Sequence, residues 1–509
     1  MAGIAFELAR LAARRLGRLQ CDAAWTFAAW ALRPWTAWAF FNLFFRWQWE
    51  AGFNERLTFP FYAIPWTKGE SFAEGLLRIW TAPNSIPWLL AALAGAAAIC
   101  ALLYGFLLKR PRRAWPSLAL LVGLAVSLHV SIACLPNADW SDPNRTSSLM
   151  AAWNRAGSTM LYSVPHVKSS GDYFRRFPEI QPKLRTTIHG LSHPPAASLS
   201  LYWIGRAMGL EKGANVRLPE VRLRYSLGLV LFGAINACVL FCLGRSLFGA
   251  PAGFLAATLW ATAPSVASYA SFAQDSVYAV FFNLSLWLGW QTATADRRPA
   301  VWAFLLGCAF FAMVFLSYSW CLATTIFALL AAFMGWRNRW NRSGWLVRAA
   351  APLAVMAVLS AAFLAWHRLD YWAMYRFANQ YVVQWYPFTG PYQWTMALVG
   401  GQIDLFVLLG GVACSAFVSA LLGFRRQGPV DPRRAYLAIV LGVFSLPLLF
   451  GPNCLKMEAA RCWIWIASVP LAFAAERLLR MPSRWFAVGA PAASAAAALA
   501  LRLFLDFGA

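Results

Sequence analysis

The apolar residues of this chain gather into long runs, and these runs decide what the chain can fold into. Most of these runs are about 17–25 residues long, the length of helix needed to cross a hydrocarbon core roughly 30 Å thick. Of the 509 residues, 60% are hydrophobic and only 13% are charged. A soluble chain of this length needs a larger charged surface. The sequence therefore predicts an all-α fold, a polytopic bundle of transmembrane helices.

About thirteen spans are expected, with a large extracytoplasmic loop that carries short helices between the third and the fourth. Arg33-Pro34 interrupts the first of them. The predicted spans cover residues 24–45, 86–108, 113–135, 226–248, 252–270, 275–293, 300–317, 319–336, 346–366, 394–424, 435–450, 459–477 and 485–506.

Short basic connections orient these spans, because positively charged loops resist translocation across the membrane. The tract 109–113 is therefore expected in the cytoplasm. Alternation from it places the other basic tracts on the same side, at 297–298, 337–342, 425–434 and 477–484. The loops 136–225 and 367–394 are then outside. The basic, amphipathic N-terminus is predicted to be a cytoplasmic interfacial helix.

Charge and cysteine usage exclude two function classes. The net charge of +24 is concentrated in the short connections, which favours membrane orientation over nucleic-acid binding. The ten cysteines are scattered and show no paired spacing, so we expect neither a zinc site nor a disulfide framework. We therefore expect membrane lipids as partners, and no nucleic acid.

The polar residues that are hardest to explain structurally fall on the predicted outer side. Ionisable groups at membrane depth are expensive and usually face a cavity or a partner. We therefore expect one polar cavity that opens outward, formed by Asp139, Asp142, Asp172, His193, Asp275, Asp404, Lys456, Glu458 and Arg461.

Asp139 and Asp142 stand three residues apart directly after a span. In a helix or tight turn the two carboxylates point the same way. Such a pair can act as a general base on an acceptor hydroxyl, or hold a divalent cation. The alternative is turn chemistry, because the surrounding residues are turn formers.

His193 precedes Pro194-Pro195 and an apolar stretch of small residues that is predicted to start a helix. Proline fits the first helical turn, where its missing N–H costs nothing. His193 would then stand beside free N–H groups that favour anions such as phosphate. The alternative is that the prolines only start the helix and His193 caps it.

Lys456, Glu458 and Arg461 form a charged cluster at the start of an apolar run. Arg461 or Lys456 could bind a phosphate, with Glu458 fixing the rotamer. An ion pair between Glu458 and Arg461 within one helix is the alternative. Asp275 and Asp404 could likewise be simple helix caps. The aromatic residues of loop 367–394 favour a belt at the membrane surface over stacking on a sugar.

The order and sidedness of these motifs resemble the GT-C superfamily of polytopic glycosyltransferases. That superfamily uses polyprenyl-phosphate sugars, and it includes the protein O-mannosyltransferases and the aminoarabinose transferases of lipid A. Three segments look more narrowly like a bacterial group of uncharacterised GT-C-like membrane proteins: 172–195, 401–406 and 458–463. The resemblance covers roughly residues 112–478.

The resemblance implies inverting transfer of a sugar from a lipid phosphate to a lipid, glycan or protein acceptor on the outer face. By position, Asp139 or Asp142 matches the catalytic base of the family. Arg461, Lys456 and His193 would bind the donor phosphate, and Glu458, Asp275, Asp404 and Asp172 would support them. A divalent cation is the one cofactor considered, held by Asp139 and Asp142. The implied location is a bacterial inner membrane, with the N-terminus in the cytoplasm.

Three regions are expected along the chain. Residues 1–110 hold the interfacial helix and extra spans, 111–478 the GT-C-like core with loop 136–225, and 479–509 a last span. A transporter or flippase of lipid-linked sugars is the rival interpretation, because an outward cavity would carry the same charges. Alternating access favours matched half-repeats, and none is visible. An inactive scaffold of the same fold is a third possibility.

Overall fold

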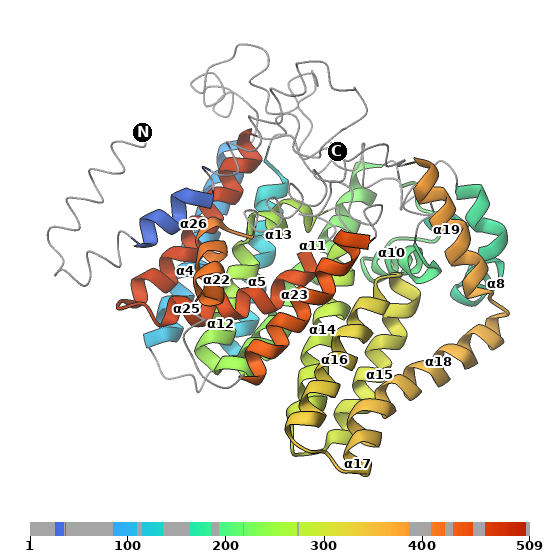
Figure 1. Ribbon diagram of the computed structural model, residues 1–509. Coiled ribbons are helices and arrows are strands. Elements are labelled where there is room, and N and C mark those ends of the chain that lie inside the picture. Colours follow the sequence, from blue (N-terminus) through green and yellow to red (C-terminus); the bar gives the residue numbers. More distant parts are fainter. Residues whose placement is uncertain are drawn as a thin grey trace, which may run out of the picture.

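The structure is a computed structural model in which the described residues are 26–34, 36, 85–108, 114–135, 163–184, 193–216, 218–271, 274–385, 409–422, 431–450 and 464–504. Every regular element in these ranges is a helix (Figure 1). Seven helices among them are long and apolar enough to cross a membrane. The prediction of an all-α, polytopic membrane bundle is confirmed, while the number of thirteen spans stays a prediction.

Most helices of the bundle overlap the predicted apolar runs. Their bounds are α4 (Ser85–Leu108), α5 (Ala114–Ala133), α11 (Pro219–Phe248), α12 (Ala250–Thr262), α13 (Pro264–Tyr269), α14 (Asp275–Thr294), α15 (Pro299–Leu316), α16 (Trp320–Arg337), α17 (Arg342–Trp345), α18 (Ala351–His367), α22 (Gly411–Leu422), α23 (Pro432–Phe450), α25 (Ser468–Leu479) and α26 (Arg484–Phe504). Shorter elements are η4 (Val164–His166), α8 (Ser170–Ile180), η5 (Gln181–Leu184), α10 (Pro195–Ala207), α19 (Tyr371–Trp385), η6 (Leu346–Ala350) and η10 (Ile464–Ala467).

One predicted span is broken in the structure. The run 252–270 forms two helices, α12 and α13, separated at Ala263, whose backbone is extended at φ −60° and ψ 131°. The residue before a proline is pushed out of the helical region by the proline ring, and Pro264 follows directly. The hydropathy of the run conceals this break, so the prediction of one continuous helix was wrong.

Small residues let the central helices approach closely. A Cβ added at Gly253 of α12 would lie 2.5 Å from the carbonyl oxygen of Phe241 in α11. A Cβ at Gly244 of α11 would lie 2.8 Å from the Cα of Gly253. Membrane helices associate through such close packing, because lipid tails leave little hydrophobic driving force between them.

Several polar side chains within the bundle hydrogen-bond to one another or to backbone carbonyls. The Nδ2 of Asn283 donates to Oδ1 of Asn236 over 3.3 Å, which joins α14 to α11. The Trp260 indole N–H donates to the Gly233 carbonyl over 2.9 Å, and His129 Nε2 lies 2.8 Å from the Ala261 carbonyl. No water is present in the hydrocarbon core to hydrogen-bond such groups, so partners within the protein are required.

Of the described basic connections, those from α14 to α15 and from α16 to α17 lie at the bottom of Figure 1. Gln291 Nε2 donates to Ser246 Oγ over 2.6 Å, and Arg348 Nη1 donates to the Thr292 carbonyl over 3.2 Å. Arg484, at the start of α26, contacts the carbonyl of Leu107 at the end of α4. The alternation predicted from charge stays a prediction, because the tracts 109–113 and 425–430 lie outside the described residues. We call the end of the bundle that carries these connections the basic end.

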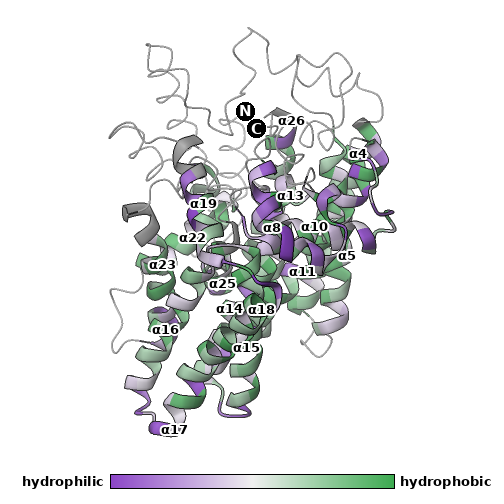
Figure 2. Ribbon diagram, turned by 90° about the vertical axis from the view of Figure 1, so that its right-hand side faces the viewer, coloured by the Kyte–Doolittle hydropathy of each residue, from purple (hydrophilic) through white to green (hydrophobic). Residues whose placement is uncertain are grey.

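The opposite end, which we call the outer end, carries the short helices α8, α10 and α19. Figure 1 shows α8 and α19 side by side at the upper right, and Figure 2 shows hydrophilic ribbon at α8 and at α17, on opposite ends of a mainly apolar bundle. Gln181 Nε2 donates to the Met374 carbonyl over 3.5 Å, which ties α19 to the element after α8. The candidate site is sought at this end.

Candidate functional site

His193 stands at the start of α10, as the sequence predicts. Pro195 is the first helical residue and Pro194 is the N-cap, with no side chain capping the helix. The His193 ring lies against the Tyr278 ring of α14, at 5.5 Å between centroids and 33° between planes. The N-cap position itself is Pro194, so both interpretations of His193, as a phosphate ligand and as a cap, stay predictions. The imidazole joins the first turns of two helices.

Gln274 locks these two helix starts together. Its Nε2 donates to Ser200 Oγ over 2.6 Å and also contacts the carbonyl of Ala197, both on α10. The side chain is 7% exposed, and its Oε1 is buried without a hydrogen-bond partner among the described residues. Asp275 follows in the first turn of α14, where a carboxylate is favoured by the helix dipole. Asp275 and His193, two of the nine residues predicted to share a cavity, thus lie at the starts of α14 and α10.

Three hydroxyl side chains cluster at α10, from Ser163, Tyr173 and Ser198. Ser163 Oγ donates to Ser198 Oγ over 2.6 Å. The Tyr173 side chain is fully buried, and this burial raises the pKa of its phenol to about 12, although the hydroxyls of Ser198 and Ser163 act in the opposite direction. These hydroxyls can donate and accept but stay neutral near pH 7. Sequence reasoning missed Ser163 and Ser198, because nothing local marks two serines 35 residues apart as partners.

Asp172 has a structural role in α8. Its backbone N–H donates to the Oγ of Ser169, the N-cap, over 3.2 Å, and its carboxylate lies 3.5 Å from Arg176 Nη1 one turn later. A carboxylate in a first helical turn, followed by a cation four residues on, stabilises the helix. Its predicted supporting role in the cavity therefore has a competing local explanation.

The described part of the aromatic loop, α19, is anchored by its first tyrosine. Tyr371 Oη donates to the Val314 carbonyl over 2.9 Å and accepts from the Trp320 indole over 3.0 Å. Trp372 is 61% exposed and stacks on Tyr375 at 5.4 Å. One aromatic residue therefore braces the ends of α15 and α16, while its neighbour faces outward as the residues of an interfacial belt do.

Six predicted residues lie outside the described residues: Asp139, Asp142, Asp404, Lys456, Glu458 and Arg461. The predicted divalent cation at Asp139 and Asp142 is untested for the same reason. Within the described ranges no group of three His, Cys, Asp or Glu side chains could hold a metal. Ala133, at the end of the helix that precedes Asp139, belongs to the same buried cluster as Ala197 and Tyr278.

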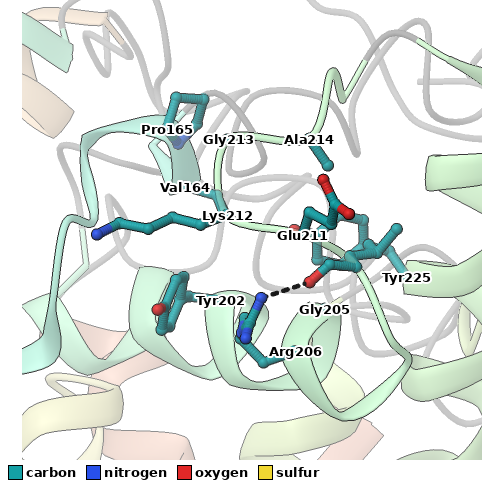
Figure 3. A pocket seen from close by; sticks show the side chains of 11 residues that line it. Val164, Pro165, Tyr202, Gly205, Arg206, Glu211, Lys212, Gly213, Ala214 and Tyr225 are labelled. Atoms are coloured by element: carbon teal, nitrogen blue, oxygen red, sulfur yellow. Dashed lines mark hydrogen bonds between the residues drawn. The ribbon is translucent and has the colours of Figure 1, made fainter.

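A small cavity opens beside α10 at the outer end, shown in Figure 3. Its lining includes Tyr202, Arg206, Lys212 and Tyr225, and Arg206 Nη1 donates to the Leu210 carbonyl over 2.9 Å. The space is about 10 Å³, which is close to the minimum needed for one water molecule. It is too small for a sugar, so we do not place the candidate site there.

The helices and the polar outer end together define a polytopic α-helical integral membrane protein, whose candidate site lies opposite its basic connections. No family model and no curated protein matches the chain.

Among solved structures, the chain is similar to the oligosaccharyltransferase of Archaeoglobus fulgidus. Its complex with zinc and sulfate aligns at 14% identity and a TM-score of 0.38, covering 70% of this chain and 52% of that one. The apo form aligns at 11% identity and a TM-score of 0.40, covering 78% and 57%. The form tethered to an acceptor peptide with the NVT sequon aligns at 10% identity and a TM-score of 0.40, covering 78% and 55%. This chain spans little more than half the length of that protein.

Proposed function

We propose that this protein is a membrane glycosyltransferase of the GT-C type, which moves a sugar from a polyprenyl-phosphate donor to an acceptor at the outer face. The observation that carries the proposal is the start of α10. There a proline-initiated helix N-terminus and the His193 ring meet the first turn of α14 at the outer end. Pro194 and Pro195 carry no N–H and the Ala197 N–H donates to the Pro194 carbonyl over 3.1 Å, so it is the positive end of the helix dipole that favours a phosphate at this N-terminus.

The proposed chemistry is an inverting displacement at the anomeric carbon. Asp139 or Asp142 takes the proton of the acceptor hydroxyl as its oxygen bonds to the sugar, and the bond from the sugar to the lipid phosphate breaks. The phosphate leaves with the electron pair and is stabilised by Arg461, Lys456 and His193. Glu458, Asp275, Asp404 and Asp172 are the proposed supporting residues. A divalent cation at Asp139 and Asp142 would lower the charge on the leaving phosphate.

A donor held by its lipid tail suits this arrangement, because the tail can stay in the bilayer while the phosphate lies among polar groups at the outer end. The acceptor would be a lipid, glycan or protein exposed on that face. We place the protein in a bacterial inner membrane, with its N-terminus in the cytoplasm.

The test is transfer of radiolabelled sugar from polyprenyl-phosphate donors to membrane extracts, with the full chain in lipid nanodiscs. Asp139→Asn and Asp142→Asn are compared with the wild type, and loss of transfer in one of them would name the base. Asp296→Asn, at an exposed carboxylate on the basic end, is the matched control and should retain full activity. His193→Ala should weaken donor use.

Two other outcomes would redirect the assignment. Donor movement across the bilayer without transfer would indicate a flippase of lipid-linked sugars. Absence of donor binding by correctly folded protein would contradict the proposal and leave an inactive scaffold.

A further inference from the structure

A second charged cavity lies at the basic end, remote from the outer end. It has a volume of about 200 Å³ and is enclosed by the ends of α11, α22 and α25 and the start of α23. Four arginines and two carboxylates line it, a surplus of two positive charges: Arg433, Arg434, Arg477, Arg480, Asp431 and Glu476. One water needs about 10–15 Å³ on this measure, so the space admits a phosphate-sized group.

Two of these arginines are held in place by neighbours other than the carboxylates. Arg477 Nε donates to Ser419 Oγ over 3.0 Å, and its guanidinium carbon lies 6.0 Å from the Trp30 ring centroid. The Arg433 guanidinium carbon lies 5.4 Å from the centre of the Phe248 ring. Because aromatic stacking fixes the guanidinium plane, less conformational entropy is lost when an anion binds.

The two carboxylates are engaged locally. Asp431 Oδ1 accepts the backbone N–H of Arg433 over 3.0 Å and so caps the start of α23. Glu476 pairs with Arg480 one turn along α25. Within the described residues, neither carboxylate forms an ion pair with the side chain of Arg433 or Arg477, whose guanidinium N–H groups are the preferred partners of phosphate oxygens.

Membrane orientation alone does not require this arrangement. The positive-inside effect is met by exposed residues such as Arg297 and Arg298 in the connection between α14 and α15. At the cavity, by contrast, the cations surround a space with an apolar floor, where Phe248 and Phe473 pack edge to face at 4.8 Å. Basic pockets between helices at this membrane face suit anionic lipid head groups.

We propose that this cavity binds the phosphate head group of an anionic membrane lipid, with Arg433 and Arg477 as its main ligands. The helices end here, so a lipid in the surrounding leaflet can present its phosphate to the cavity while its tails stay in the bilayer. Phe248 and Phe473 contact the apolar part next to the phosphate. The proposal does not depend on the chemistry at the outer end.

Native mass spectrometry of the full chain in detergent tests the proposal, with phosphatidylglycerol titrated against phosphatidylcholine. The wild type should bind phosphatidylglycerol in preference. The double variant Arg433→Gln with Arg477→Gln should bind it roughly 30-fold more weakly, from the loss of two cationic contacts. Arg297→Gln with Arg298→Gln removes the same charge from an open connection and should bind as the wild type does.

Three outcomes would overturn the proposal. Equal loss in both double variants would mean that only general charge matters. Undiminished lipid binding by the double variant of Arg433 and Arg477 would show that these two arginines do not bind the lipid phosphate. Inorganic phosphate that competes with the lipid at equal concentration would make a soluble phosphate the ligand. If the double variant misfolds, Arg433→Gln alone, at an exposed position, is tested for the same loss of preference for phosphatidylglycerol.

Discussion

At the scale of single residues, Gln274 is the side chain that most directly holds the candidate site together. It is nearly buried, and its amide nitrogen contacts two oxygens of α10. The amide must therefore donate, and a group that can only accept would face the lone pairs of Ala197 and Ser200. A carboxyl group at position 274 could therefore donate to these oxygens only when it is protonated, so the stability of such a variant depends on pH.

We predict that Gln274→Glu destabilises the protein at neutral pH and recovers as the pH falls. A buried carboxylate that faces a carbonyl oxygen is disfavoured, whereas its protonated form can donate as the amide does. Stability of the variant relative to the wild type should thus rise towards acid. Thermal unfolding in detergent between neutral pH and pH 5 measures this. Gln274→Leu should lose about 1–3 kcal/mol without the same dependence on pH. A parallel response in both variants would contradict the hydrogen-bond assignment.

A second prediction concerns Tyr173, whose pKa is raised to about 12 by burial. The folded state then favours the neutral phenol, so its contribution to stability is complete below pH 10 and is lost as the pH rises towards 12. Tyr173→Phe should flatten the decline of the unfolding temperature in that range. An identical alkaline decline in the wild type and the variant would show that other groups cause it.

Parts of this site were predictable from sequence, and the physical reason is locality. Pro194-Pro195 and Asp275 are helix-start signals that act within one turn, so the positions of His193 and Asp275 at two helix starts followed from them. The contact between those starts did not follow, because Gln274 reaches α10 across 77 residues of sequence. For Asp139, Arg461 and their four companions outside the described residues, the assignment stays a prediction.

At the scale of elements, the pair α11 and α12 shows how small residues set the spacing of helices. Gly253 approaches the backbone of Phe241 and Arg245 so closely that no side chain fits between them. The backbone cannot yield as a flexible side chain would. The distance between the two helices is therefore fixed by the absence of a Cβ.

We predict that Gly253→Ala lowers the free energy of unfolding by about 1–3 kcal/mol, because the added methyl must push α12 away from α11. Gly123→Ala in α5, where no atom lies within 4 Å of the added Cβ, is the control. It should change stability by less than about 1 kcal/mol, since alanine favours a helix. Heat stability in detergent, read by size-exclusion chromatography, compares the two. Equal effects would disprove the close approach.

Element boundaries were predictable where hydropathy and helix signals coincide. The predicted run 86–108 and α4 end at the same residue, because charged residues follow the helix directly. They differ at the start by one residue. The break within the run 252–270 was not predicted, because its composition stays apolar through Pro264 while the backbone is not helical at Ala263. Length and hydropathy indicate that a segment can cross a membrane, and a proline within it indicates where the helix is interrupted.

At the scale of the whole molecule, the two ends differ in charge and in architecture. One end has short arginine-bearing connections, and the other has α8, α10 and α19. This polarity was predictable, because it depends only on the alternation of spans and the position of basic residues. Which helices are neighbours was not, since the apolar faces of the spans are nearly interchangeable in sequence.

The polarity predicts how the ends react in membrane vesicles. Asn338→Cys, exposed at the basic end, should react with a membrane-impermeant maleimide in inside-out vesicles only. Lys212→Cys, exposed at the outer end, should react in right-side-out vesicles only. Both are made with Cys321→Ser, because Cys321 is an exposed native thiol. Labelling of both positions from one side would overturn the common orientation of the connections.

The hydrogen bond from Gln181 to Met374 joins residues 193 positions apart, and it sets an order for biosynthesis. Tyr173 and Phe177 bury their rings in a cluster that includes Phe315 and Met374, which the ribosome supplies much later. The apolar face of segment 163–184 must therefore stay uncovered until α15 and α19 have been synthesised. An uncovered apolar face of this kind is prone to aggregation during synthesis, so the later arrival of α15 and α19 limits how long the nascent chain is exposed.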